Sequence, residues 1–193
     1  MTISTAWLLA LSLAMVLKPV AAQTSMQAER HPDWATPLPQ VSNLHQVTPV
    51  LYRSAMLDRA DVAQLQALGV KTVISLRSFH SDSEVLKDSG IRTVRIRINT
   101  WAIRDRHVIE AMRGIRAAET HGPVLLHCLH GADRTGMMTA MYRMLYQGWP
   151  REKAIDELKN GGYGYHAVWR NIEKYLKRVD VEAIRAQIEQ EKP

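Results

Sequence analysis

Hydrophobic and polar positions follow two different periods along this chain, and the switches between them predict a succession of strands and helices. Short, mostly apolar runs at 50–53, 70–76 and 123–127 are typical of strands, and residues 91–98 alternate strictly, with Val94, Ile96 and Ile98 on the inward side. Apolar residues recur at helical spacing in 58–68, 105–119 and 135–147. We also expect a short helix around 83–87 and two or three helices after Gly148.

The order of these elements predicts the fold class. Strands that alternate with helices are typical of α/β domains, in which a mostly parallel central sheet is flanked by helices. The run at 123–127 lacks the alternation of a half-exposed strand, so we expect it near the centre of that sheet.

The first 22 residues differ from the rest of the chain. Residues 6–17 form an uncharged apolar run that is too short to cross a bilayer, and Val20 and Ala22 suit the small-residue positions before a signal-peptidase cut. The lack of an early basic residue and the position of Lys18 fit this pattern less well, which leaves an uncleaved anchor or an amphiphilic helix as the alternative. We expect 1–22 to be a cleaved signal peptide, which predicts an exported protein.

The rest of the chain has room for one domain behind a short arm. Residues 23–45 are rich in proline and are predicted to be an extended arm, and 46–193 the domain. Hydrophobic residues make up 46% and charged residues 23%, a globular balance that excludes a disordered chain. Loss of 1–22 removes only Lys18, leaving 24 basic and 19 acidic residues and a charge of about +5. This charge favours anionic substrates, but it is too small and too evenly spread to indicate nucleic-acid binding.

Cys128 is the only cysteine in the chain, so no internal disulfide can form. Exported proteins usually carry cysteines in pairs, and a single one is therefore either accidental or chemical. Its neighbours favour chemistry, because the sequence HCLHGADRTG at 127–136 lies between the predicted central strand and a helix. Ligands bind at this end of the strands in open α/β sheets.

The spacing of Cys128 and Arg134 suits a phosphate monoester. A five-residue loop can surround a phosphate, with the sulfur beneath phosphorus and the planar guanidinium holding two oxygens. Loop amides and a helix N-terminus would stabilise both the phosphate dianion and the thiolate. Thiolate attack would give a phosphocysteine that water hydrolyses, while Thr135 could hydrogen-bond the departing sulfur. The predicted substrate-binding residues are Leu129, His130, Gly131, Ala132, Asp133 and Arg134.

The stretch 127–136 resembles the His-Cys-x5-Arg-Thr signature loop of protein tyrosine and dual-specificity phosphatases. The preceding histidine, internal glycine, following Thr-Gly and strand–loop–helix context make this match specific. Segments at 51–55, 70–74, 122–125, 140–143 and 148–149 are similar to small exported bacterial dual-specificity phosphatases, and the similarity covers roughly 33–180.

This resemblance implies a compact phosphatase domain with no metal and no cofactor. It implies phosphotyrosine substrates, with or without phosphoserine and phosphothreonine, and a periplasmic location. The partner would be a phosphorylated protein, such as an envelope or inner-membrane signalling protein, and we expect a monomer.

The proton donor of the family, an aspartate upstream of the cysteine, has no direct counterpart. Counting back from Cys128 without gaps places it near Trp101, whereas Asp105 lies four residues later, at a predicted helix start where aspartate is also a common N-cap. Asp133, directly before Arg134, is the second candidate, and an enzyme without a dedicated acid is the third possibility. We take Asp105 as the expected donor.

Two other functions remain open from the sequence. The first is a phosphatase for phosphoinositides or inositol phosphates, supported by Asp133 and the basic surface. The second is an impaired phosphatase that binds phosphoproteins without turnover, which the displaced acid would explain.

Overall fold

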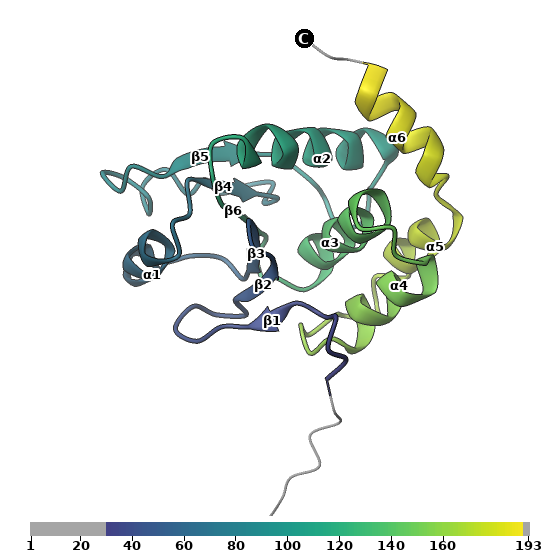
Figure 1. Cartoon of the computed structure of the whole chain (residues 1–193), viewed down its shortest axis with the longest axis horizontal. Helices are drawn as coiled ribbons and strands as arrows, with labels where there is room; N and C mark the ends of the chain where they lie inside the picture. The colour runs from purple at the N-terminus through teal and green to yellow at the C-terminus, as the bar shows by residue number, and fades with distance from the viewer. Residues whose placement is uncertain (1–29, 191–193) are drawn as a thin grey trace, which may run out of the picture.

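The computed structural model describes residues 30–190, so the expected signal peptide at 1–22 lies outside the described part. Six strands form one sheet in the order β1-β2-β3-β6-β4-β5 (Figure 1). The strands are β1 (Thr36–Pro37), β2 (His45–Thr48), β3 (Leu51–Ser54), β4 (Thr72–Ser75), β5 (Arg92–Arg95) and β6 (Val124–His127).

The sheet is parallel at its centre and antiparallel at one edge. Strands β3, β6, β4 and β5 run parallel to one another, while β1 and β2 add on as antiparallel strands. Strand β6 lies between β3 and β4, which confirms the prediction that the run 123–127 is central. The predicted α/β class with a mostly parallel sheet is also confirmed.

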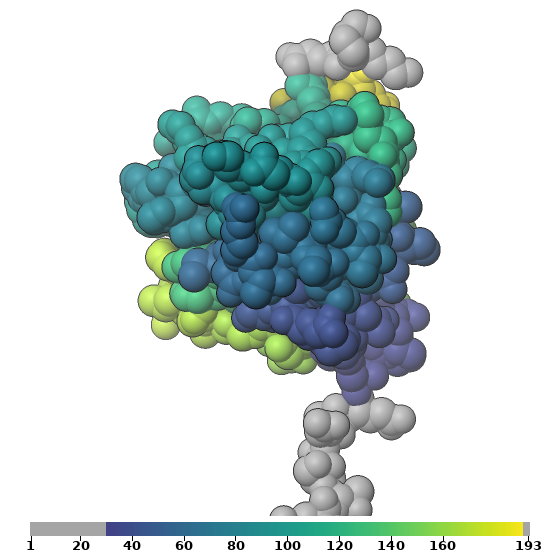
Figure 2. Space-filling model, turned by 90° about the vertical axis from the view of Figure 1, so that its left-hand side faces the viewer, coloured from purple at the N-terminus to yellow at the C-terminus, as the bar shows by residue number. Residues whose placement is uncertain are grey.

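Helices cover both faces of this sheet. Helix α1 lies on one face and α2 to α6 on the other (Figure 1), and Figure 2 views the molecule from the α1 side. The helices are the 3-10 turn η1 (Arg59–Asp61), α1 (Val62–Ala67), α2 (Asp105–Glu119), α3 (Asp133–Tyr146), α4 (Arg151–Asn160), α5 (Arg170–Arg178) and α6 (Val181–Gln190).

The uninterrupted apolar run of β6 follows from its two-sided burial. Val124 and Leu126 belong to the larger core beneath α2 to α6, whereas Leu125 belongs to the smaller core beneath α1. All three side chains are fully buried. A strand covered on both faces needs no polar side, so its sequence does not alternate.

The short helix predicted around 83–87 is wrong. Residues 83–88 form successive turns, in which the Leu86 amide donates to the Asp82 carbonyl and the Ser89 amide to the Leu86 carbonyl. The segment is too short for further hydrogen bonds to offset the unfavourable free energy of helix nucleation. The Asp82 side chain is instead directed at the signature loop, as described below.

The described part of the predicted arm packs onto the domain through a buried polar network. The amide of Ala35 donates to Glu157 at 2.8 Å, and Glu157 also forms a 2.8 Å ion pair with Arg143. Burial opposes the charged form of Glu157, but the hydrogen bond and charge of Arg143 outweigh it and lower the pKa of this carboxyl. Strand β1 and this network hold residues 30–45 against the sheet and α4.

Within residues 30–190, no helix is long and apolar enough to cross a membrane.

Candidate active site

The signature loop connects the central strand to a buried helix. Cys128 directly follows β6 and is only 2% exposed, and α3 begins five residues later at Asp133. Parallel strands on both sides of β6 end at the same level, since Ser54 and Ser75 both pair with His127. The nucleophile predicted from the sequence therefore lies at the carboxyl edge of the sheet, in front of a helix N-terminus.

Gly131 lets the loop turn tightly against β3. Its φ is +70°, and a Cβ atom there would lie 2.5 Å from the carbonyl oxygen of Ser54 and 2.7 Å from the amide nitrogen of Ala55. Both contacts are to backbone, which cannot move aside, so only glycine fits.

Arg53 supports the loop from beneath. Its guanidinium donates to the Gly131 carbonyl at 2.7 Å and stacks on the Tyr163 ring, with 3.6 Å between the guanidinium carbon and the ring centroid. Burial lowers the pKa of Arg53, while Tyr163, Glu157 and Cys128 favour its charged form. This side chain is 1% exposed, so it acts on the loop and does not reach the surface.

The loop amides are available to a ligand. Among residues 30–190, the backbone amides of 129–135 donate none of the hydrogen bonds found outside the helices and strands. Buried amides are normally paired, and a run of free ones at a helix N-terminus forms an anion site. Gly131 and Ala132 are buried and can contribute only their backbone, whereas Leu129 and His130 are exposed.

Arg134 is held by the ends of two strands. Its Nη1 donates to the carbonyls of Leu76 and Ile98, each at 3.2 Å, just beyond β4 and β5. The buried Nε has no partner among the described residues. The guanidinium is thus fixed at one edge while donors remain for an oxyanion.

Thr135 has a buried hydroxyl close behind the nucleophile in sequence. Its Oγ1 has no hydrogen-bond partner within residues 30–190. An unpaired buried hydroxyl is costly unless a bound state uses it.

The histidine before the nucleophile is paired with a carboxylate that the sequence analysis missed. His127 Nε2 lies 2.8 Å from Asp82 Oδ2, and its Nδ1 lies 3.1 Å from the carbonyl oxygen of Cys128. Burial disfavours the charged form of Asp82, but the hydrogen bond and charge of His127 dominate and lower the pKa of this carboxyl.

A pocket of about 280 Å³ opens over the loop. It brings together four of the predicted substrate-binding residues, namely Leu129, His130, Asp133 and Arg134. Its other lining residues are Thr100, His166, Val168 and Trp169.

Asp105 lies outside this pocket. It is the first residue of α2, and its carboxylate accepts a 2.7 Å hydrogen bond from the hydroxyl of Tyr175. It lines a different hollow, together with residues of α5 such as Asn171 and Lys174. The described arrangement does not bring Asp105 together with Arg134, and its role as acid stays a prediction.

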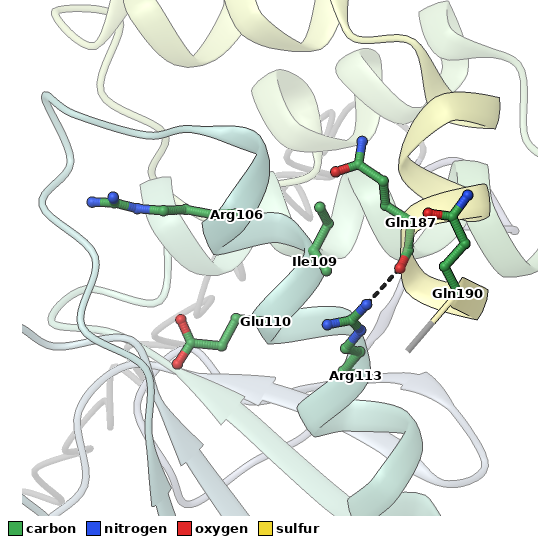
Figure 3. Close-up of a pocket in the computed structure, with 6 residues that line it drawn as sticks. All are labelled: Arg106, Ile109, Glu110, Arg113, Gln187 and Gln190. Carbon is green, nitrogen blue, oxygen red and sulfur yellow. Dashed lines mark hydrogen bonds between the residues drawn. The ribbon is translucent and has the colours of Figure 1, made fainter. Parts of the chain in front are cut away.

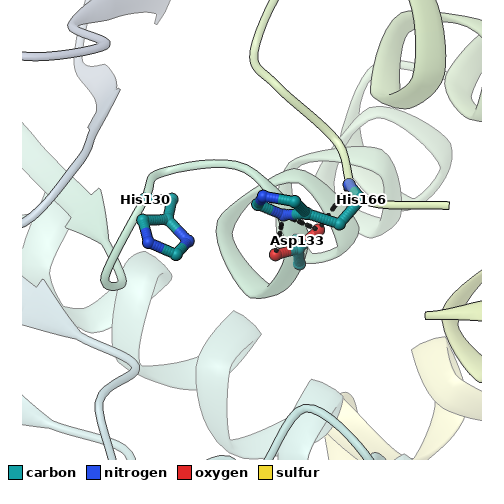
Figure 4. Close-up of side chains that lie close together, drawn as sticks. All are labelled: His130, Asp133 and His166. Carbon is teal, nitrogen blue, oxygen red and sulfur yellow. Dashed lines mark hydrogen bonds and ion pairs between the residues drawn. The ribbon is translucent and has the colours of Figure 1, made fainter. Parts of the chain in front are cut away.

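Asp133, the second candidate acid, faces the pocket and is joined by two histidines (Figure 4). His166, from the segment after α4, lies over the Asp133 carboxylate, and His130 stands beside it on the loop. Each of the three residues offers one potential metal-ligand atom, and these atoms lie within 4.8 Å of one another. The cluster is therefore the place where a metal ion could be held, although the same contacts also suit proton transfer.

The sequence carried no signal for two of these residues. His166 and Asp82 lie 33 and 45 positions from their partners, and neither is part of a motif. An aspartate directly before a catalytic arginine could have prompted a search for a basic partner, but only the fold identifies which one.

Another hollow, of about 410 Å³, lies between α2 and α6 (Figure 3). It is lined by side chains such as Glu110, and the backbone oxygen of Gln187 accepts a hydrogen bond from Arg113 across it. No residue of the signature loop lines it.

Known proteins are similar to this chain in sequence and fold. The family model described as "Tyrosine phosphatase family" matches residues 39–191. The dual specificity protein phosphatase TpbA of Pseudomonas aeruginosa is 39% identical over 165 residues, which cover 86% of this chain and 74% of that protein. A crystal structure of TpbA superposes with a TM-score of 0.76 at 37% identity, covering 81% of this chain and 97% of that one.

Two further structures are similar. A cysteine-to-serine variant of TpbA in complex with pTyr gives a TM-score of 0.77 at 36% identity, covering 82% of this chain and 98% of that one. The catalytic domain of a PP-IP phosphatase from S. cerevisiae shares the fold, with a TM-score of 0.67 at 20% identity and coverage of 80% and 95%.

Proposed function

Because this chain belongs to the tyrosine phosphatase family, we propose that it hydrolyses phosphate monoesters on phosphoproteins, with phosphotyrosine as the main substrate and Cys128 as nucleophile. The observation that carries the proposal is the run of loop amides, without a backbone acceptor outside helices and strands among residues 30–190, between a buried cysteine and a strand-anchored arginine. In the proposed reaction these amides are the donors to a dianion, and the sulfur of Cys128 is the nucleophile.

Each residue of the loop has a role in this proposal. The Cys128 thiolate attacks phosphorus, the amides of 129–135 hold the equatorial oxygens, and Arg134 follows them as the bond to the leaving group lengthens. Gly131 and Ala132 act through their backbone only. The hydroxyl of Thr135, unpaired among the described residues, donates to the sulfur when water cleaves the phosphocysteine.

Phosphotyrosine is favoured by the rim of the pocket. Leu129 and Val168 are 38% and 76% exposed, and Trp169 also lines the opening. Exposed apolar side chains around a polar floor suit an aryl ring that carries a phosphate. TpbA, the relative crystallised with pTyr, supports the same substrate.

The location proposed for the protein rests on its N-terminal sequence. Cleavage of residues 1–22 would start the mature protein at Gln23 and deliver a monomeric domain to the periplasm. Its substrate there would be a phosphorylated envelope or inner-membrane signalling protein. An alkaline-phosphatase fusion after residue 30 should be active outside the cytoplasm, whereas a cytosolic product that keeps Met1 would refute export.

The substrate is tested by a panel measured under one set of conditions. Phosphotyrosine, phosphoserine and phosphothreonine peptides are compared with phosphoinositides and inositol phosphates, and released phosphate is quantified. We expect the highest kcat/KM with phosphotyrosine peptides. Preference for inositol phosphates would contradict the proposed substrate, and tight peptide binding without phosphate release would identify an impaired phosphatase.

A further inference from the structure

The proposed reaction needs a proton donor, and the described pocket holds one carboxylate, Asp133. The Asp133 side chain is 10% exposed and already engaged by a single residue. Its Oδ1 accepts the backbone N–H of His166 at 2.9 Å, and its Oδ2 lies 2.9 Å from His166 Nδ1. Two contacts from one residue fix both the chain and the ring at the pocket wall.

The contact on Nδ1 leaves the other ring nitrogen available. With Nδ1–H donating to a carboxylate, Nε2 is free to hold or release a proton. The His166 side chain is 48% exposed and lines the same pocket as Arg134. The buried carboxylate of Asp133 is therefore hydrogen-bonded to a half-exposed imidazole that lines the pocket.

We propose that His166 donates the proton to the leaving oxygen and that Asp133 is the residue that positions it. This inference rests on the proposed phosphatase function and names the acid for that same site. Asp133 is not itself the acid in this account, because its carboxylate is turned toward the imidazole.

Atoms and charges balance in both steps. The sulfur lone pair of Cys128 forms the S–P bond while the P–O bond to the substrate breaks, and the departing oxygen takes the proton from Nε2 of the imidazolium. The neutral imidazole of His166 then accepts a proton from water as that water attacks phosphorus. The S–P bond breaks, which releases phosphate and restores the thiolate and the imidazolium.

Groups of both polarities surround the ring. The Asp133 carboxylate contacts Nδ1, while the guanidinium of Arg134 and the ring of His130, 5.3 Å away between centroids, line the same pocket. A leaving oxygen bound in this pocket would therefore lie among the side chains that surround the imidazole.

The test compares two substrates in four variants. His166→Ala should lower kcat for a phosphotyrosine peptide about 10²-fold or more, and should lower kcat for an aryl phosphate with an acidic leaving phenol far less, because a good leaving group needs no proton. Added imidazole should restore part of the lost peptide activity. Asp133→Asn should also slow the peptide more than the activated aryl phosphate, but by a smaller factor. The control variant His121→Ala changes an exposed histidine after α2 and should match the wild type.

Several results would overturn the proposal. An equal loss for both substrates in His166→Ala, without imidazole rescue, would make the residue structural. If Asp105→Asn slowed the peptide far more than the activated aryl phosphate and His166→Ala did not, the acid would be the aspartate at the start of α2. If a chelator lowered the rate of the wild type but not that of His166→Ala, the cluster would be a metal site. Absence of activity in the wild type on either substrate would instead refute the phosphatase function itself.

Discussion

His127 Nε2 lies 2.8 Å from Asp82 Oδ2, and both side chains are almost completely buried. The other ring nitrogen of His127 faces the carbonyl oxygen of Cys128 at 3.1 Å. Both ring nitrogens of His127 therefore have an oxygen within hydrogen-bond distance. Asp82, directly before the turn segment at 83–88, thereby holds His127, the residue that precedes Cys128.

Removal of one member of this pair should be costly. Asp82→Ala leaves a buried imidazole without its partner, and we expect a loss of about 3–5 kcal/mol in the free energy of unfolding. Asp82→Asn keeps a polar partner and should be milder. Urea denaturation measures both, with Glu84→Ala, an exposed residue of the same segment, as the control. Stability unchanged in Asp82→Ala would show that the pair contributes nothing.

Gly131 offers a test that separates backbone strain from steric overlap. Gly131 and Gly148 both have a φ near +70°, but a Cβ at Gly148 would meet nothing within 4 Å, whereas one at Gly131 would overlap β3. Gly148→Ala should cost about 1 kcal/mol of stability and leave kcat/KM unchanged. Gly131→Ala should shift the loop and lower kcat/KM about 10²-fold. Steady-state kinetics on an aryl phosphate would disprove this if the two variants behaved alike.

Stability should depend on pH through His45. Burial lowers the pKa of His45 to about 4 from an ordinary value of 6.5, so between these two pH values the unfolded chain binds a proton that the folded chain does not. The free energy of unfolding is therefore highest above pH 6.5, and it falls by about 3 kcal/mol in total as the pH drops through this window. Urea denaturation at pH 7.5 and pH 5 should show a smaller difference in the free energy of unfolding for His45→Gln than for the wild type. Identical pH dependence in the two proteins would contradict the assignment.

Local patterns predicted most of the fold and the centre of the site. The helix over 105–119 has the predicted bounds, and the position of Cys128 between a central strand and a helix follows from one apolar run and its neighbours. These features depend on residues close together in the chain, so the spacing of hydrophobic positions is enough to predict them.

The partners of the site could not be predicted in this way. Asp82 and His166 reach the signature loop through tertiary structure, and nothing in their own neighbourhoods marks them. For Asp105 the sequence offered two explanations, a helix start and an acid. The fold places it first in α2, with a partner in Tyr175 and no contact to the pocket of Arg134 among the described contacts.

Direct detection of the phosphocysteine tests the central claim most sharply. Wild-type protein mixed with an activated aryl phosphate and quenched in acid within milliseconds should carry one phosphoryl group on the peptide that contains Cys128, with a burst of phenol of equal amount. Cys128→Ser should show neither label nor burst, yet should still bind a phosphotyrosine peptide, because the loop amides and Arg134 remain. Turnover in Cys128→Ser, or a wild-type burst with the label on another residue, would contradict the account.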